Sequence, residues 1–199
     1  MASTLAAAVF ALGIAGAAAQ PAPSAVPPRK EQKKASQLIS KQAPPKVSTR
    51  VLERATPDNV TIHVSLDKQR AYLKVGDEIA IDTPVSTGKR AGMTPPGSYT
   101  ILEKDADHRS SIYGEFVNRK SGSVVRSGVS TKIDSAPSGT MYRGAPMRWF
   151  MRLSWQGVGM HTGILPGYPA SHGCVRLPDE IARMFYDRVK LGTVVTIGD

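Results

Sequence analysis

Residues 160–178 read MHTGILPGYPASHGCVRLP, and the chain is organised around this stretch. It holds the single cysteine of the protein, Cys174, and two of the four histidines, His161 and His172. A cysteine sulfur attacks as a thiolate, and a neighbouring imidazole can accept the thiol proton. Gly173 leaves the backbone beside the sulfur open to a substrate, with amides available for an oxyanion. A lone cysteine is often a small buried apolar residue, but these polar neighbours favour a reactive thiol.

The same stretch resembles the catalytic motif of the L,D-transpeptidase (YkuD-like) family of cell-wall enzymes. The motif is a histidine, a short spacer with Gly and Pro, then Ser-His-Gly-Cys and an apolar residue. The segments STGK at 86–89 and TPPG at 94–97 also resemble Thr-Gly and Thr-Pro-Gly segments of that family. The resemblance covers residues 59–199. The chain departs from several members by having Arg176 where they have Asn, and its spacer is shorter than in some.

The resemblance implies a role for each residue of the motif. Cys174 would be the nucleophile and His161 the general base that donates and accepts the proton. From spacing alone the base would remain open, because His172 is closer to the cysteine in sequence. The supporting residues implied are Thr162, whose carbonyl would hold the imidazole tautomer; His172, a structural member of the turn; Gly173, whose amide with that of Cys174 would form the oxyanion hole; and Ser171 and Arg176, which would brace the loop or contact substrate.

The resemblance also implies the reaction and its partners. A peptidoglycan tetrapeptide stem would be cleaved between its third residue and the terminal D-Ala, which leaves a thioester on Cys174. The thioester would pass to a side-chain amine of another stem, in cross-linking, or of a wall-anchored protein. Neither a cofactor nor a metal is expected for such an acyltransferase.

Three alternatives to this reading remain open. Water could resolve the thioester, which would make the enzyme a carboxypeptidase, or an amidase that detaches an anchored protein. His161, His172 and Cys174 could instead bind zinc with His63 or His108 as a fourth ligand, although the usual C-x-x-C or H-x-x-x-H pairs are missing. The domain could also be a non-catalytic wall-binding module that keeps the motif as scaffold.

The N-terminal segment indicates export to the periplasm or cell envelope. Residues 5–19 form an uncharged, Ala-rich run that ends in AAA before Gln20, which is typical of a signal peptide. Because the run is shorter than the roughly 18 to 20 residues of a membrane span, we expect residues 1–19 to be cleaved. The first four residues lack Lys and Arg, so an uncleaved membrane anchor is the alternative.

Residues 20–58 are predicted to be a disordered, basic, Pro-rich linker without apolar periodicity. Eight Lys or Arg against three acidic residues give it a net charge of +5, half of the +10 of the whole chain. This charge suits attraction to wall carboxylates or anionic lipids, or it merely keeps a spacer extended. Nucleic acid is not expected as a partner, because export removes the protein from it.

Residues 59–199 are predicted to form the mainly β catalytic domain, a sandwich or meander with one clear helix near the C-terminus. Apolar and polar residues alternate over 59–66, 71–75 and 147–153, as in half-buried strands. Pro178 and two acids begin a helix, and Gly192 follows its last turn. The buried stripe of that helix is predicted to be Ile181, Met184, Phe185 and Val189. A strand over 193–197 closes the domain, and no βαβ alternation is present.

Residues 105–145 are the least regular part of this domain. The Gly- and Ser-rich segment 121–144 is predicted to be a long connection. In the family that the chain resembles, the equivalent region varies and can cap the active site, so a lid is one role open to this region. Beyond it, Arg148, Phe150 and Arg152 share one face of a predicted strand and could form a groove wall that meets a carboxylate.

Overall fold

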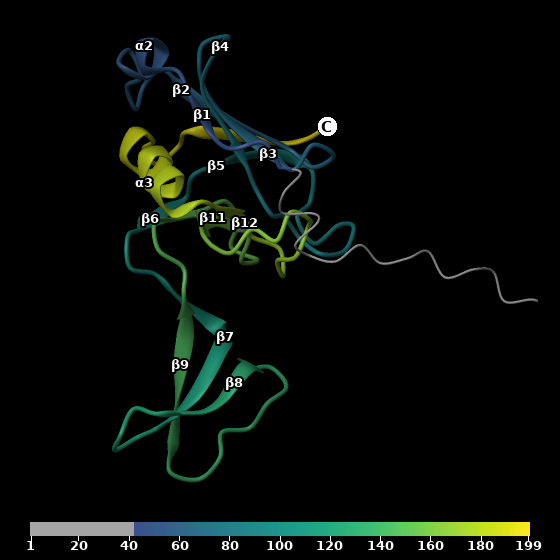
Figure 1. The fold of residues 1–199 in the computed structure, drawn as a ribbon, viewed down its shortest axis with the longest axis vertical. Coiled ribbons are helices and arrows are strands. Elements are labelled where there is room, and N and C mark those ends of the chain that lie inside the picture. Colours follow the sequence, from purple (N-terminus) through teal and green to yellow (C-terminus); the bar gives the residue numbers. More distant parts are fainter. Residues whose placement is uncertain (1–41) are drawn as a thin grey trace, which may run out of the picture. The chain divides into compact units, whose positions relative to one another are not determined.

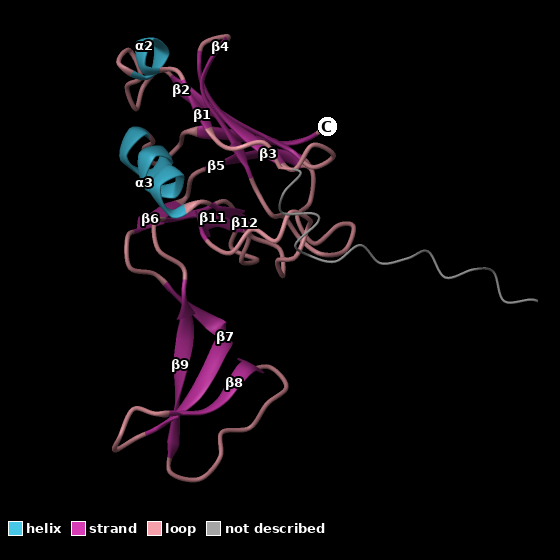
Figure 2. Cartoon of the chain, viewed as in Figure 1, coloured by secondary structure: helices cyan, strands magenta, loops and turns pink. Residues whose placement is uncertain are grey.

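The computed structural model describes residues 42–199 (Figure 1). The predicted signal peptide and most of the predicted linker lie outside these residues. Within them the chain is mainly β, with strands far outnumbering helical segments (Figure 2), which confirms the fold class expected from the sequence. No helix in residues 42–199 is long and apolar enough to cross a membrane.

In chain order the elements are β1 (Lys46–Val47), α2 (Thr49–Leu52), β2 (Val60–Ser65), β3 (Arg70–Val75), β4 (Glu78–Pro84), β5 (Gly97–Thr100), β6 (Glu103–Asp105), β7 (Arg109–Asn118), β8 (Val124–Ser130), β9 (Thr140–Pro146), β10 (Phe150–Arg152), β11 (Gly159–Thr162), β12 (Val175–Leu177), α3 (Asp179–Arg188) and β13 (Val194–Gly198). They form a six-stranded sheet of order β1-β4-β3-β2-β13-β5, a four-stranded sheet of order β12-β11-β10-β6, and a three-stranded sheet of order β8-β7-β9.

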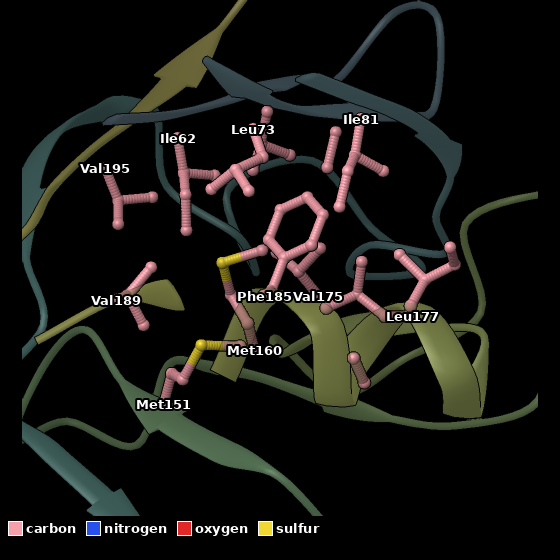
Figure 3. Close-up of a cluster of buried hydrophobic side chains, with 14 of the residues drawn as sticks. Ile62, Leu73, Ile81, Met151, Met160, Val175, Leu177, Phe185, Val189 and Val195 are labelled. Atoms are coloured by element: carbon pink, nitrogen blue, oxygen red, sulfur yellow. The ribbon is translucent and has the colours of Figure 1, made fainter. Parts of the chain in front are cut away.

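The core lies between the six-stranded sheet, the four-stranded sheet and α3. Figure 3 shows Phe185 of α3 with Ile62 and Leu73 of the first sheet on one side and Met151 and Met160 of the second on the other. All five side chains are at most 1% exposed. Complete burial of such a side chain contributes about 1.5–3 kcal/mol, so Phe185 joins the two sheets. Of the other residues in the predicted stripe, Ile181 and Val189 are buried and Met184 is partly buried.

Packed structure begins earlier than the sequence indicated. Val51 and Leu52 of α2 are buried in the core, and the Ser48 N–H donates to the Ala80 carbonyl at 2.9 Å. The linker predicted over residues 20–58 was therefore too long at its C-terminal end. Two adjacent apolar residues in a four-residue helix leave no periodicity to read, which is why the sequence did not reveal them.

The region predicted as a long connection, 121–144, contains two strands instead. β8 and β9 both pair with β7. Gly114 and Gly144 allow β7 and β9 to approach closely, because a Cβ on Gly144 would lie only 2.1 Å from the Ser110 carbonyl oxygen. The prediction failed because the glycines that permit this pairing are the residues that a sequence reading assigns to loops.

The three-stranded sheet is an insertion into a hairpin. β6 and β10, which precede and follow it, pair directly with each other, with Asp105 opposite Phe150. Two further hydrogen bonds close its base, from the Trp149 N–H to the Ala106 carbonyl at 3.0 Å and from the Met147 N–H to the His108 carbonyl at 2.8 Å.

The strand predicted over 147–153 is shorter, because it forms only at β10. Trp149 has a φ of 57°, and this left-handed conformation interrupts an extended chain. Phe150 and Met151 face opposite sides of β10 and are both buried, because Met151 packs in the core while the Phe150 ring stacks on His108, with centroids 4.2 Å apart.

Candidate active site

Two parallel strands bring the sequence motif together. β11 pairs with β12 so that Met160 lies opposite Val175 and His161 lies opposite Arg176. Met160 and Val175 are fully buried in the core, which fixes both strands. Cys174 immediately precedes β12, so the thiol stands next to the strand that carries His161. Twelve residues separate β11 from β12 in sequence, but the two strands lie side by side in the sheet.

Hydrogen bonds within and across the loop fix the backbone at Cys174. Ser171 Oγ donates to the Cys174 carbonyl at 2.6 Å and accepts from the Gly173 N–H at 3.0 Å. Thr94 Oγ1 donates to the Gly173 carbonyl at 2.6 Å and accepts from the Gly88 N–H at 2.8 Å. Because Thr94 bonds both to Gly88, six positions away, and to the distant Gly173, the segments 86–89 and 94–97 together support the cysteine loop.

Gly173 is required by its conformation and its surroundings. Its φ is +139°, and a Cβ at this position would lie 2.9 Å from the Met93 carbonyl oxygen. A side chain would therefore displace either the cysteine loop or its support. Further out, an isolated bridge between Ser86 and Arg176 holds the start of β12, with backbone hydrogen bonds of 3.0 and 3.1 Å.

Thr94→Val should test this support. Valine keeps the shape but removes the hydroxyl, which leaves the Gly173 carbonyl and the Gly88 N–H without their partner at a site where Thr94 is only 4% exposed. We expect a loss of about 1–3 kcal/mol in the free energy of unfolding, measured by urea denaturation, and a drop in activity. Thr61→Val, on an exposed position of β2, is the control and should change neither. A fully stable and active Thr94→Val protein would mean that the loop holds its shape without this residue.

A cavity of about 790 Å³ opens at the cysteine loop. It is lined by the motif residues His161, Thr162, Ser171, His172, Cys174 and Arg176, by Arg148, Phe150 and Arg152 from the predicted groove wall, and by Ser110–Tyr113, Ala145 and Pro146 from the three-stranded sheet. The inserted sheet therefore supplies part of the cavity wall. The residues of β7 in this wall carry no sequence signal that would have identified them.

The His161 side chain is held in one tautomer. Its Nδ1 lies 2.6 Å from the Thr162 carbonyl oxygen, so Nδ1 carries the proton and donates it, and Nε2 keeps a free lone pair. The residue is 7% exposed. Burial lowers the pKa of His161 to about 4, and the charge of Arg176 acts in the same direction, while the Thr162 carbonyl opposes both. At neutral pH the imidazole is therefore an uncharged proton acceptor.

The Cys174 thiol is also uncharged in this resting arrangement. Its Sγ donates to the Gly157 carbonyl at 3.3 Å. Desolvation by the surrounding protein raises the pKa of Cys174, although the Gly159 N–H and the charges of Arg176 and Arg152 oppose the rise. A neutral thiol and a neutral imidazole therefore line the same cavity, and ionisation must accompany attack on a substrate.

The second histidine of the motif has different surroundings. His172 is exposed, its ring stacks on Tyr113 with centroids 4.2 Å apart, and its Nε2 lies 3.1 Å from Lys89 Nζ. Burial and then the Lys89 charge lower its pKa. The ring thus connects the cysteine loop to the inserted sheet, which is consistent with a structural role.

Metal-binding groups in residues 42–199 lie elsewhere. One set of three, Glu103, Asp105 and His108, has ligand atoms within 4.8 Å of one another, and it includes neither Cys174 nor the two motif histidines. His63, the other suggested fourth ligand, lies on β2 beside Thr196, with its Nδ1 3.0 Å from Oγ1. The zinc arrangement considered from the sequence therefore does not form in the described part of the chain.

The chain is similar in sequence to known cell-wall enzymes. The family model for the L,D-transpeptidase catalytic domain (YkuD) matches residues 59–197. L,D-transpeptidase 2 of Mycobacterium tuberculosis (strain CDC 1551 / Oshkosh) is 31% identical over an alignment of 132 residues, and the match covers 63% of this chain and 28% of that protein. The chain thus spans well under a third of the length of this curated relative.

Two solved structures share the fold. An L,D-transpeptidase from Mycobacterium smegmatis superposes with a TM-score of 0.52 at 22% identity, over 70% of this chain and 58% of that one. Mycobacterium tuberculosis L,D-transpeptidase 1 superposes with a TM-score of 0.50 at 21% identity, over 70% of this chain and 62% of that one.

Proposed function

Because the chain belongs to the L,D-transpeptidase catalytic domain family, we propose that it is a peptidoglycan L,D-transpeptidase that works through a thioester on Cys174. The observation that carries the proposal is the pairing of β11 with β12, which sets a neutral His161, held by the Thr162 carbonyl, on the strand beside Cys174 at one cavity. This is the arrangement that a cysteine nucleophile and its general base need.

In the first half of the reaction, His161 Nε2 accepts the thiol proton as Sγ attacks the scissile carbonyl of the stem. The Cys174 N–H is the proposed oxyanion donor, since the Gly173 N–H is already bonded to Ser171 Oγ. When the tetrahedral intermediate collapses, the C–N bond breaks and the His161 imidazolium protonates the departing amine of D-Ala. The acyl group of the third residue remains on Cys174 as a thioester.

In the second half, an acceptor amine attacks the thioester carbonyl. His161 removes a proton from the amine, the C–S bond breaks, and Sγ recovers a proton from the imidazolium. The acceptor is proposed to be the side-chain amine of another stem, in cross-linking, or of a wall-anchored protein.

Since stems lie outside the cytoplasmic membrane, we also propose that residues 1–19 direct export to the periplasm and are then cleaved. The intact mass of protein recovered from the cell envelope tests this. Retention of Met1 would indicate a membrane anchor instead.

The experiment that tests the proposal is intact-protein mass spectrometry with a synthetic tetrapeptide stem. We expect an adduct on Cys174 with the mass of the stem lacking D-Ala. A labelled amine added afterwards should appear in the released product. Release of unlabelled acid at the same rate with and without the amine would mean hydrolysis, and therefore a carboxypeptidase or amidase using the same site.

The pH dependence should report the low pKa of His161. The base acts only when neutral, and burial holds its pKa near 4, so kcat/KM should rise through about pH 4 and be flat from pH 6 to neutrality. Stem carboxyl groups titrate in a similar range, so alkylation of Cys174 by uncharged iodoacetamide provides a second profile without them. An acid limb near 6.5 in both profiles would contradict a buried, neutral base.

A further inference from the structure

Three arginine side chains line the cavity, and two of them already have a carboxylate partner. Arg152 Nε lies 2.6 Å from Glu103 Oε2, and Arg148 Nη1 lies 3.7 Å from Asp179 Oδ2. Arg176 has no carboxylate within 4.0 Å among residues 42–199. It is thus a half-buried cation in a substrate-sized cavity whose counter-charge does not come from the described chain.

The backbone and stem of Arg176 are fixed. Its N–H and carbonyl both bond to Ser86, at 3.0 and 3.1 Å. Its side-chain stem lies against Gly163, where a Cβ would be only 2.7 Å from Arg176 Cγ. A long side chain loses conformational entropy when it is immobilised. Because this packing already restricts the Arg176 side chain, less of that entropy is lost when the guanidinium binds a ligand.

The position relative to Cys174 defines which atoms the guanidinium can reach. Val175 and Leu177 are fully buried on one face of β12, so Cys174 and Arg176 share the opposite face, about 7 Å apart along the strand. A reacting carbonyl carbon must come within about 3–3.5 Å of Sγ. The carboxylate of a residue that directly follows the scissile bond is three covalent bonds from that carbon, so it lies between Sγ and the end of the arginine side chain.

We propose that Arg176 determines specificity by binding the C-terminal carboxylate of the leaving residue. An arginine–carboxylate pair is bidentate and charge-assisted, so it would select stems in which a single free residue follows the cleaved bond. The inference rests on the proposed function and adds the group that recognises the leaving residue.

The test compares a tetrapeptide stem with a free C-terminus and the same peptide as a C-terminal carboxamide. Both are assayed at pH 8, where His161 is neutral with or without Arg176, by the rate of Cys174 acylation. Wild-type protein should prefer the free acid by about 10- to 100-fold, as expected for one charge-assisted hydrogen-bonded pair. In Arg176→Gln the preference should fall to within about threefold, because only the free acid loses a partner, whereas any effect of the lost charge on Cys174 falls on both peptides alike. Arg176→Lys should recover part of the preference, because it restores the charge without the fork.

Two controls separate this role from others. Arg50→Gln removes the same charge from an exposed residue of α2 whose partner, Glu78, also binds Arg54, and it should leave the preference intact. Two carboxylates can lie next to the scissile bond, the C-terminal one of the leaving residue and one on the side chain of the third residue. A third peptide keeps the free C-terminus but has a third residue without a side-chain carboxylate. Its acylation rate should fall in Arg176→Gln by as much as that of the first free-acid peptide.

Other results would overturn the inference. An equal loss on acid and carboxamide in Arg176→Gln, with unchanged thermal unfolding, would mean that the arginine only shapes the loop or its electrostatics. An Arg176→Gln defect that disappears with the third peptide would assign the arginine to the third residue instead. No acylation of wild-type Cys174 by any of the peptides would contradict the proposed function itself.

Discussion

Replacing Cys174 with alanine is expected to lower turnover of a tetrapeptide stem by at least about 10⁴-fold while leaving the fold intact. The chain has no second thiol, so nothing else can carry the acyl group as a thioester. The cost to stability should be small, because the side chain lies at the cavity and sulfur forms only weak hydrogen bonds, such as the one to the Gly157 carbonyl at 3.3 Å.

The measurement pairs product release with thermal unfolding of the same preparations. Cys174→Ser serves as the matched variant, since it keeps the shape and a hydroxyl but has a much poorer nucleophile. Both variants should lack the acyl adduct and melt close to the wild-type temperature. An adduct on either variant with unreduced turnover would show that another residue is the nucleophile.

His161→Ala is expected to lower the acylation rate by about 10²- to 10⁴-fold, the range for loss of a general base. Without the Nε2 lone pair, the thiol has no acceptor for its proton, and its raised pKa leaves little thiolate at neutral pH. The defect should shrink at high pH, where hydroxide removes the proton instead.

His172→Ala is the matched control, because it removes the same side chain from the same cavity. Its ring stacks on Tyr113 and contacts Lys89, so its loss should disturb the wall without removing the base, and the rate should fall less than in His161→Ala. Its defect should not shrink at high pH. A nearly active His161→Ala protein beside an inactive His172→Ala protein would reverse the assignment.

The parts of the fold that the sequence revealed are those with local patterns. The spacing of apolar residues predicts which side chains are buried in β2, β3 and α3. The turn between Val75 and Glu78 is likewise indicated by its local residues. The motif also gave the part of the cavity lining that lies between His161 and Arg176. Which histidine shares a sheet with the segment after Cys174 could not be read from spacing, because it depends on the pairing of β11, which carries His161, with β12.

The remaining features depend on contacts between distant segments. Thr94 is separated from Gly173 by 79 positions, and nothing in TPPG indicates that its hydroxyl will support the cysteine loop. Tyr113 is an ordinary strand residue until the fold sets it against His172. The burial of Val51 and Leu52 could not be predicted from their basic, Pro-rich surroundings. The composition of a segment does not show whether the folded domain offers an apolar surface against which two of its residues can pack.

The insertion between β6 and β10 has a consequence for how enzymes of this architecture can diversify. Its base is closed by the pairing of Asp105 with Phe150 and by the two backbone hydrogen bonds beyond it. The closure entropy of the enclosed chain grows only logarithmically, by about 0.6 kcal/mol for each doubling of length. Residues 109–146 could therefore be lengthened, shortened or exchanged through evolution or engineering at little thermodynamic cost. Each exchange would remodel one wall of the cavity, while His161 on β11 and Cys174 just before β12 would stay on parts of the fold that the insertion does not build.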